Sequence, residues 1–323
     1  MSESSQLPMV SIIAVCYNHA KFVVDCLDHI RAQTYTNAEL IIMDDCSKDD
    51  SVSIIRNWIK IHEYNCTFIA HTENIGFCKT LNEALATAKG EYISIIATDD
   101  TWEPDKIERQ MVVMRAQPEQ VAVVYSDAAQ MDESGRRLPK SLLTASNHGI
   151  NLPSGRIFST LVDINIIPAM ATIIRRQAIE AVGGYDERLT YEDYDMWLRL
   201  AERYGFVFCP GIVANYRIVS TSITRTIFHN PTAKHSYSEF MLREKWWNSD
   251  LLSPAQRTHW AKIQLAAADS LYVHGDPRAR LCLWKAYIRT RKPRALMLAL
   301  ACSLGISRSK AKKLQSLLRG SSG

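Results

Sequence analysis

Hydrophobic residues in the first 125 positions follow two alternating patterns. Short apolar runs rich in β-branched residues predict buried strands at 9–16, 39–43, 66–70, 92–97 and 121–125. Between them, apolar residues recur every three or four positions, as Val23, Leu27 and Ile30 do, and predict helices at 22–33, 50–62, 77–88 and 104–115. We expect Ser47 to cap the second helix. Strands alternating with helices indicate an α/β fold with a mostly parallel, Rossmann-like sheet covered by helices on both faces.

The rest of the chain is less regular. A helix and a strand are expected within 157–175, helices at 177–182 and 192–204, and strands at 206–209 and 212–217, whereas 126–155 reads as strand ends and loop. After about Thr226 the strand signals stop and the pattern is helical. We therefore expect an α/β domain over residues 1–225, followed by a helical, basic C-terminal region over 226–323.

Charge is distributed unevenly along the chain. Ten of the 38 Lys and Arg residues lie from Lys285 onward, where there is no acid, which leaves 28 against 34 Asp and Glu, a net charge of −6, in the rest. A basic tail indicates an anionic partner. The apolar stretch 295–306 is too short to span a membrane. With basic residues on both sides, it fits either a helix lying in a membrane interface or a buried helix of a small helical domain.

Cysteine usage and the N-terminus bear on the compartment. The eight cysteines include no C-x-x-C pair, so we expect no zinc site, and free thiols fit a reducing cytosol. Residues 1–8 are polar and do not resemble a secretory signal. The sequence predicts a cytoplasmic protein, either free or peripheral on the inner face of the cell membrane.

Polar side chains follow three of the predicted strands. Tyr17 comes after the first strand, Asp44 and Asp45 end the second, and Asp99 and Asp100 follow the fourth. Because parallel strands end at one edge of a sheet, these groups should meet in one crevice. Oxygen ligands there suit Mg²⁺ or Mn²⁺ carrying a substrate diphosphate. Each group also has a structural interpretation: the acids as turn residues or helix caps, and the tyrosine as core.

Three other kinds of protein could use such a crevice. A dinucleotide-dependent oxidoreductase needs G-x-G-x-x-G after the first strand, and residues 16–20 contain no glycine. A nucleotidyltransferase also uses a metal at a strand end, but the Gly-rich basic loop that it usually carries after the first strand is absent. A binding module that kept the fold without activity is disfavoured by the intact acids.

Four stretches of the chain together resemble glycosyltransferase family 2, the inverting group with the GT-A fold, of bacterial polysaccharide type. They are VSIIAVCYNHAKFV, ELIIMDDCSKDDS, TENIGFCKTLNEALATAKGEYISIIATDD and GGYDERLTYEDYDMWLRLA, which span residues 9 to about 220 in the family's order. The resemblance implies a GT-A domain whose first strand, second strand and Asp-x-Asp region bind the donor nucleotide.

The resemblance also implies roles for single residues. Asp193, in the Glu-Asp pair that opens a helix, matches the general base, Glu192 would face the acceptor, and Asp100 would hold the metal. The implied donor-binding residues are Val15, Tyr17, Asp45, Lys79 and Asp99. The chain departs from the family where Ala97 replaces a frequent aspartate and where Ile218-Val219 follow Tyr216-Arg217 in place of a frequent histidine.

The resemblance predicts a metal-dependent, inverting glycosyltransferase using Mn²⁺ or Mg²⁺. It would move a sugar from a nucleotide-diphosphate donor, UDP- or dTDP-linked, to a hydroxyl of a saccharide or lipid-linked glycan, in cell-surface polysaccharide synthesis. A nucleotidyltransferase acting on sugar phosphates is the alternative. We expect no nucleic-acid partner, and we expect the basic C-terminal region to contact an anionic membrane.

Overall fold

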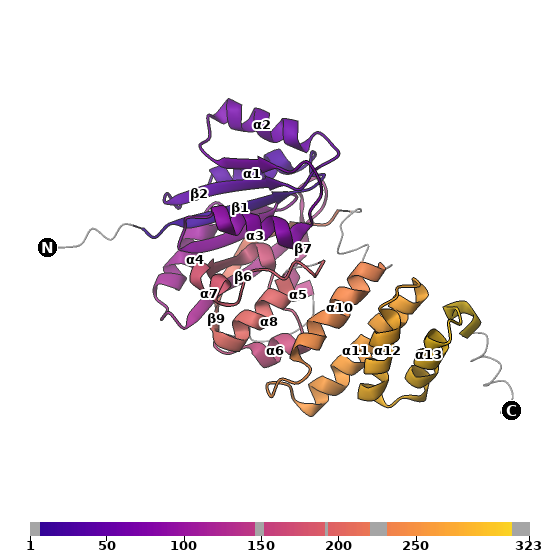
Figure 1. Cartoon of the computed structure of the whole chain (residues 1–323). Helices are drawn as coiled ribbons and strands as arrows, with labels where there is room; N and C mark the ends of the chain where they lie inside the picture. The colour runs from indigo at the N-terminus through magenta and orange to yellow at the C-terminus, as the bar shows by residue number, and fades with distance from the viewer. Residues whose placement is uncertain (1–6, 146–151, 191–192, 220–230, 312–323) are drawn as a thin grey trace. The chain divides into compact units, whose positions relative to one another are not determined.

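The computed structural model describes residues 7–145, 152–190, 193–219 and 231–311 (Figure 1). The chain forms two compact units. The sheet unit comprises Met1–Glu187 and Tyr191–Val219, and the helical unit comprises Arg188–Thr190 and Ser220–Gly323. The domain boundary expected at 225/226 lies within 220–230, outside the described residues, and stays a prediction.

A mixed sheet forms the centre of the sheet unit. Its nine described strands are β1 (Val10–Cys16), β2 (Ala38–Asp44), β3 (Thr67–Ala70), β4 (Tyr92–Ala97), β5 (Thr101–Trp102), β6 (Val121–Met131), β7 (Arg137–Ser141), β8 (Thr172–Arg175) and β9 (Gly205–Arg217). They are ordered β3-β2-β1-β4-β8-β6-β9-β5, with β7 paired to β6. The first four strands in this order are parallel, so the predicted Rossmann-like core is confirmed.

The register of the parallel strands aligns their carboxyl ends. Cys16 of β1 lies opposite Asp44 of β2, and Val15 lies opposite Ala97 of β4. The segments that follow these three neighbouring strands therefore start at the same edge of the sheet, as the sequence predicted.

The second half of the sheet differs from the prediction in one important respect. β8 lies between β4 and β6 and is antiparallel to both. Its four residues, TIIR, carry the same apolar pattern as a short parallel strand, so the sequence could not reveal its direction. The strands expected at 206–209 and 212–217 form the single strand β9, and β6 continues to Met131 because it pairs with β9 along its whole length.

Helices cover both faces of the sheet (Figure 1). The helices of this unit are α1 (Val23–Arg31), α2 (Ser51–His62), α3 (Phe77–Thr87), α4 (Lys106–Arg115), α5 (Leu142–Ala145), α6 (Phe158–Asp163), α7 (Arg176–Ala181) and α8 (Asp193–Arg203), with the 3₁₀ turn η1 (Ala169–Ala171). Buried residues of α1, α2 and α4 share one core with β1, β2 and β4. The buried residues of α3 are not part of that core. Because α3 contacts β1 and β2, it covers the opposite face of the sheet. The predicted cap Ser47 is wrong, because Asp50 precedes α2 and the Ser47 side chain donates to Asp44 instead.

The helical unit consists of α10 (Ala233–Trp246), α11 (Pro254–Val273), α12 (Ala279–Thr290) and α13 (Pro293–Ser303). Ser253 and Gln256 form a capping box at the start of α11. In α13, which contains most of the apolar stretch, Ala295, Leu298 and Ala299 are fully buried against the neighbouring helices. One side of this stretch is thus a buried helix face. Across the part of the chain that the structure describes, no helix combines the length and apolarity that crossing a bilayer requires.

A fully buried lysine links α4 to the inserted strand β8. The Lys106 ammonium donates to Ser94 Oγ and, at 2.8 Å, to the Thr172 carbonyl, and it lies 4.1 Å from the Trp102 ring centroid. Gln110 and Trp102 bind the neighbouring carbonyls of Ala171 and Met170. These three side chains therefore hold η1 and the start of β8 against the sheet. Burial keeps the pKa of Lys106 well below that of an exposed lysine.

We expect this lysine to make stability depend on pH. The unfolded chain keeps the Lys106 proton up to the ordinary lysine pKa, whereas the folded chain releases it at lower pH, so unfolding free energy should rise with pH between these two values. Lys106→Met should flatten this rise in urea unfolding series, and Lys89→Met, at an exposed position, should not. Equal slopes for Lys106→Met and the parent protein would contradict this account.

Candidate functional site

The carboxyl ends of β1, β2 and β4 are tied together by backbone hydrogen bonds. Asp45 N donates to the Cys16 carbonyl and Thr98 N donates to the Val15 carbonyl, both at 3.0 Å. Val15 itself is buried, with 2 % exposure, so it contributes to this edge of the sheet through its backbone. The segments that carry Tyr17, Asp45 and Asp99-Asp100 are therefore held side by side.

Asp100 is a buried carboxylate at this edge. Its Oδ1 accepts from the backbone N–H of Arg217 at 2.8 Å, and its side chain is almost fully removed from solvent. Burial and the neighbouring Asp99 raise the pKa of Asp100 well above that of an ordinary aspartate, although Arg217 opposes this shift. A cation placed here would remove the repulsion between the two acids.

Arg217 is a functional candidate that the sequence argument did not single out. It ends β9 and is 2 % exposed. Its guanidinium donates to the Asp99 carbonyl at 2.7 Å, to Asp25 Oδ2 at 2.6 Å and, more weakly, to the carbonyls of Asp132 and Glu133. β9 runs parallel to β6 and ends at the same edge, so the strand expected at 212–217 was the signal that could have found it.

Asp99 remains accessible where Asp100 is buried. Its side chain is 19 % exposed, and Oδ2 lies 3.8 Å from His19 Nε2. The other ring nitrogen of His19 is 2.9 Å from Thr98 Oγ1. Both ring nitrogens of His19 therefore have a polar neighbour, and the imidazole lies beside this pair of acids.

Two non-glycine residues in left-handed conformation follow β1 and β2. Asn18 has φ 59° and Cys46 has φ 64°. The two turns bind each other, because Asn18 Oδ1 accepts from Lys48 N at 2.7 Å and Asn18 N donates to Ser47 Oγ at 2.8 Å. Such conformations cost of order 1–3 kcal/mol each and gather at functional sites. Tyr17, 37 % exposed, precedes the first of them and is not a core residue.

The neighbouring acids Asp44 and Asp45 have different partners. Asp44 accepts from the backbone N and the hydroxyl of Ser47, as a turn residue does. Asp45 accepts from the backbone N–H groups of Ile75 and Gly76 at 2.9 and 3.0 Å. Those groups immediately precede α3, where the helix dipole favours a negative charge. Asp45 thus fixes the loop between β3 and α3 at the edge of the site, and its contact with a donor stays a prediction.

His71 is a second candidate that the sequence did not single out. Its Nδ1 lies 3.1 Å from Asp45 Oδ1, and its Nε2 lies 3.1 Å from Glu83 Oε2. The imidazole is 10 % exposed and lies between a nearly buried carboxylate and an exposed one. It therefore orients Asp45.

The antiparallel direction of β8 brings Asp193 toward the same edge. Thr172 starts β8 near the carboxyl end of β4, where Ser94 Oγ donates to its carbonyl, and η1 contacts β4. The chain just before η1 therefore lies beyond the carboxyl end of β4. Asn165 in this segment donates to Asp193 Oδ2 at 3.3 Å. The structure thus links the first residue of α8 to the edge that carries Asp99 and Asp100.

The surroundings of Asp193 suit a proton acceptor. Its Oδ1 accepts from the backbone N–H of Tyr194 at 2.6 Å, and its side chain is half-buried. Desolvation raises its pKa, and the bonds from Tyr194 and Asn165 counteract this shift only in part. Asp193 remains the predicted base. Its neighbour Glu192, the predicted acceptor contact, lies outside the described residues.

Lys79 is exposed on the first turn of α3. Within the described ranges no ion pair or hydrogen bond of its side chain is recorded, so its ammonium is available to solvent or to a ligand. Its role toward a phosphate stays a prediction.

The acids at the edge fit a divalent cation that shares its ligands with a substrate. No group of three or more His, Cys, Asp or Glu side chains in the described ranges forms a cage of protein ligands. Mg²⁺ typically binds one or two carboxylates together with substrate phosphates and water. Asp100 and Asp99 offer such a partial set, and burial together with the neighbouring Asp99 raises the pKa of Asp100.

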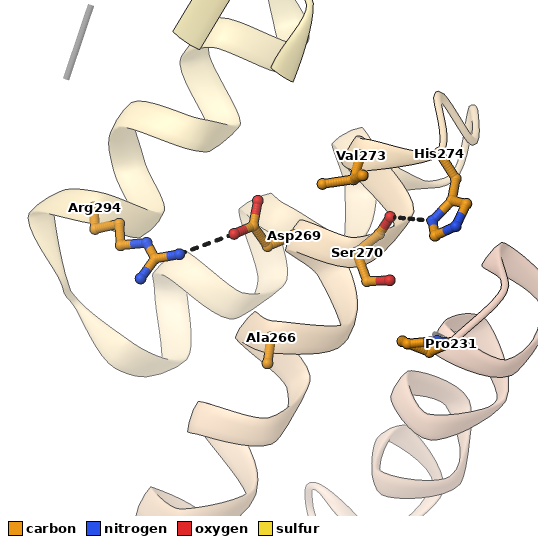
Figure 2. Close-up of a pocket in the computed structure, with 7 residues that line it drawn as sticks. All are labelled: Pro231, Ala266, Asp269, Ser270, Val273, His274 and Arg294. Carbon is orange, nitrogen blue, oxygen red and sulfur yellow. Dashed lines mark hydrogen bonds and ion pairs between the residues drawn. The ribbon is translucent and has the colours of Figure 1, made fainter. Parts of the chain in front are cut away.

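A separate hollow of about 480 Å³ lies in the helical unit. Figure 2 shows it between Pro231, α11 and Arg294. Its carboxylate, Asp269, is bound by Arg294 at 2.9 Å and also by Arg308. The hollow therefore offers no uncompensated acid for a cation.

Comparison with known proteins identifies the family. The sequence model of glycosyl transferase family 2 matches residues 11–183, which is more than half of the chain and includes β1 to α7 apart from the first residue of β1. The chain belongs to glycosyl transferase family 2. The family 2 match includes Asp45, Asp99 and Asp100, and it ends before Asp193. The chain is therefore a glycosyltransferase.

Relatives and solved structures agree with this assignment. The chain is 28 % identical over 221 residues to the putative teichuronic acid biosynthesis glycosyltransferase TuaG of Bacillus subtilis. This alignment covers 67 % of this chain and 82 % of TuaG. The fold is similar to S. aureus TarS 1–349 in complex with UDP-GlcNAc, with TM-score 0.60, 15 % identity and 92 % of each chain covered. It is also similar to the mannosyltransferase PcManGT from Pyrobaculum calidifontis in complex with GDP-Man and Mn²⁺, with TM-score 0.58 and 20 % identity over 97 % of this chain and 84 % of that one. The predicted GT-A fold is confirmed.

Proposed function

We propose that this chain transfers a sugar from a nucleotide-diphosphate donor to a hydroxyl of a saccharide or lipid-linked glycan, with inversion at the anomeric carbon. The observation that carries the proposal is the meeting of Asp45, Asp99 and Asp100 at one edge of the parallel strands, inside the family 2 match. We further propose UDP- or dTDP-sugar as donor and cell-surface polysaccharide synthesis as the setting. TuaG, named for teichuronic acid biosynthesis, and TarS, bound to UDP-GlcNAc, support both points.

The donor would lie across the carboxyl ends of β1, β2 and β4. Tyr17 presents an exposed ring on which a base can stack, and Asp45 lies with the β3–α3 loop beside it. Asp99, the more accessible acid, would accept from a ribose hydroxyl, and Lys79 would approach a phosphate. Mn²⁺ or Mg²⁺ held by Asp100 would supply the charge that stabilises the departing diphosphate.

Asp193 would act on the acceptor. Its carboxylate takes the proton of the attacking hydroxyl while that oxygen forms a bond to the anomeric carbon. The bond from the anomeric carbon to the diphosphate oxygen breaks, and the nucleoside diphosphate leaves with the bonding pair. A single displacement from the opposite face inverts the configuration. Glu192, next to the base in sequence, would contact the acceptor.

We also propose a cytoplasmic location, with the basic C-terminal region attaching the protein to the inner face of the membrane. A lipid-linked acceptor would be presented at such a surface, and the excess of Lys and Arg after Lys285 favours anionic lipid.

A screen of nucleotide sugars tests the transfer. With Mn²⁺ present, we expect one donor to release its nucleoside diphosphate, slowly to water and faster with the right acceptor, in a chromatographic assay. The same incubation without divalent cation should release far less. Release of pyrophosphate from a nucleoside triphosphate and a sugar phosphate would instead favour the nucleotidyltransferase alternative and contradict the proposal.

A further inference from the structure

The helical unit exposes a row of large apolar side chains on its last two described helices. On α12, Leu281, Trp284 and Ile288 follow each other at intervals of three and four residues and so lie on one side of the helix. The residues that α12 buries, such as Cys282 and Leu283, point to the opposite side. Leu281 and Ile288 are 62 % and 57 % exposed, far more than core residues of their type.

The outer side of α13 continues this row. Leu300 and Leu304, four residues apart, are 45 % and 75 % exposed. Trp284 Nε1 donates to Ser303 Oγ at 3.1 Å, and Ser303 lies between them in sequence, so the rows of α12 and α13 are adjacent. We call the surface formed by Leu281, Trp284, Ile288, Leu300 and Leu304 the α12–α13 face. An exposed apolar surface of this kind marks an interaction site.

The cations around the α12–α13 face are of two kinds. Some already have partners: Lys285 and Arg289 bind Glu244, while Arg294 and Arg308 bind Asp269. Others are exposed and, among the described residues, form no recorded ion pair: Arg280, Arg291, Lys292 and Lys310. From Pro277 to the end the sequence contains no acid, so positive charge beside the face is uncompensated.

We propose that the α12–α13 face docks on an anionic lipid bilayer, its apolar row entering the headgroup region and the unpaired cations binding lipid phosphates. Exposed leucine and isoleucine around a half-buried tryptophan, together with basic residues, are the chemistry of an interfacial helix. A second copy of the chain is disfavoured as the occupant because it would bring the same unpaired positive charges together. The proposal rests on the membrane contact proposed above and adds the surface that makes it.

Vesicle flotation of the full-length protein tests the proposal. We expect the protein to float with phosphatidylcholine vesicles that contain phosphatidylglycerol, to stay behind with phosphatidylcholine alone, and to be released by added salt. The double variant Leu281→Glu/Ile288→Glu should lower the apparent affinity at least about tenfold, because both side chains leave the apolar layer. The matched control Ile61→Glu/Val112→Glu changes equally exposed residues of the sheet unit and should bind as the parent does.

A charge variant provides a second test that leaves the apolar row intact. Arg280→Glu/Lys292→Glu should weaken binding by about fivefold or more for each reversed charge. Circular dichroism melting shows whether each variant folds. If Leu281→Glu/Ile288→Glu does not fold, vesicle binding by Arg280→Glu/Lys292→Glu tests the proposal instead.

The outcomes separate this inference from the proposals on which it builds. A parent protein that does not float with anionic vesicles would overturn both the membrane contact and the face. A parent that floats together with every variant would overturn the face alone. A dimer in light scattering that Leu281→Glu/Ile288→Glu disperses would assign the face to a second copy and also overturn the inference. Donor release without vesicles depends on none of these results.

Discussion

Replacing Asp193 by Asn should lower turnover by about 10²–10⁴-fold while nucleotide-sugar binding persists. The amide cannot accept the acceptor proton, and general base catalysis contributes about this much. Asn keeps the size of the side chain and can still accept from Tyr194 N through its carbonyl oxygen, although it loses the second acceptor, to which Asn165 donates. Single-turnover transfer and donor titration of the same preparation measure the two properties separately.

The transfer rate of the parent enzyme should also depend on pH through Asp193. The pKa of Asp193 is raised by desolvation, so the base becomes protonated, and the rate should fall, at a higher pH than for an exposed aspartate. Asp193→Asn should lack this acidic limb. Asp105→Asn, which changes an exposed acid before α4, should keep both the rate and the limb. Near-parental turnover of Asp193→Asn would show that another group takes the proton.

Replacing Arg217 by Met should lower the free energy of unfolding by about 2–3 kcal/mol. The side chain is buried and donates to the Asp99 carbonyl, to Asp25 and to a third segment at Asp132–Glu133, and its loss leaves these acceptors without a charged donor. Asp25 is 46 % exposed and regains water, so the ion pair alone contributes little of this. Urea unfolding at neutral pH measures the effect.

Two further variants identify the cause. Arg217→Lys keeps the charge without the planar fork and should recover only part of the lost stability. Asp25→Asn removes the ion pair and keeps the carbonyl bonds, so it should cost less than about 1 kcal/mol. A loss for Asp25→Asn as large as that for Arg217→Met would mean that the ion pair, rather than the bonds to the carbonyls, stabilises this edge.

Local patterns predicted the part of the fold that is built from consecutive strands and helices. β1 and β4 end at Cys16 and Ala97 as the apolar runs indicate, and β2 ends one residue later than predicted, at Asp44. The parallel arrangement follows from the helices between them. The direction of β8 does not follow from such patterns, because it is set by pairing with β4 and β6, strands far away in sequence.

The difference between local patterns and contacts between distant residues also explains which site residues the sequence could predict. Asp45, Asp99 and Asp100 were visible because they follow strands directly. Arg217 and its partner Asp100 are 117 residues apart, and the sequence around either residue does not predict their contact. Asn165 reaches Asp193 only because β8 is antiparallel and returns the chain to the edge of β4. The missed residues are those that hold the acids in place.

Binding of a nucleoside diphosphate with and without Mn²⁺ tests the central claim most directly. We propose that Asp100, buried beside Asp99 at the carboxyl end of β4, binds a cation shared with the donor diphosphate. Isothermal titration should show UDP or dTDP binding at least about tenfold more tightly with Mn²⁺ to the parent protein. Asp100→Asn should lose this enhancement and still bind weakly through the base and ribose. Equal affinity with and without Mn²⁺, or an enhancement that survives in Asp100→Asn, would contradict the account.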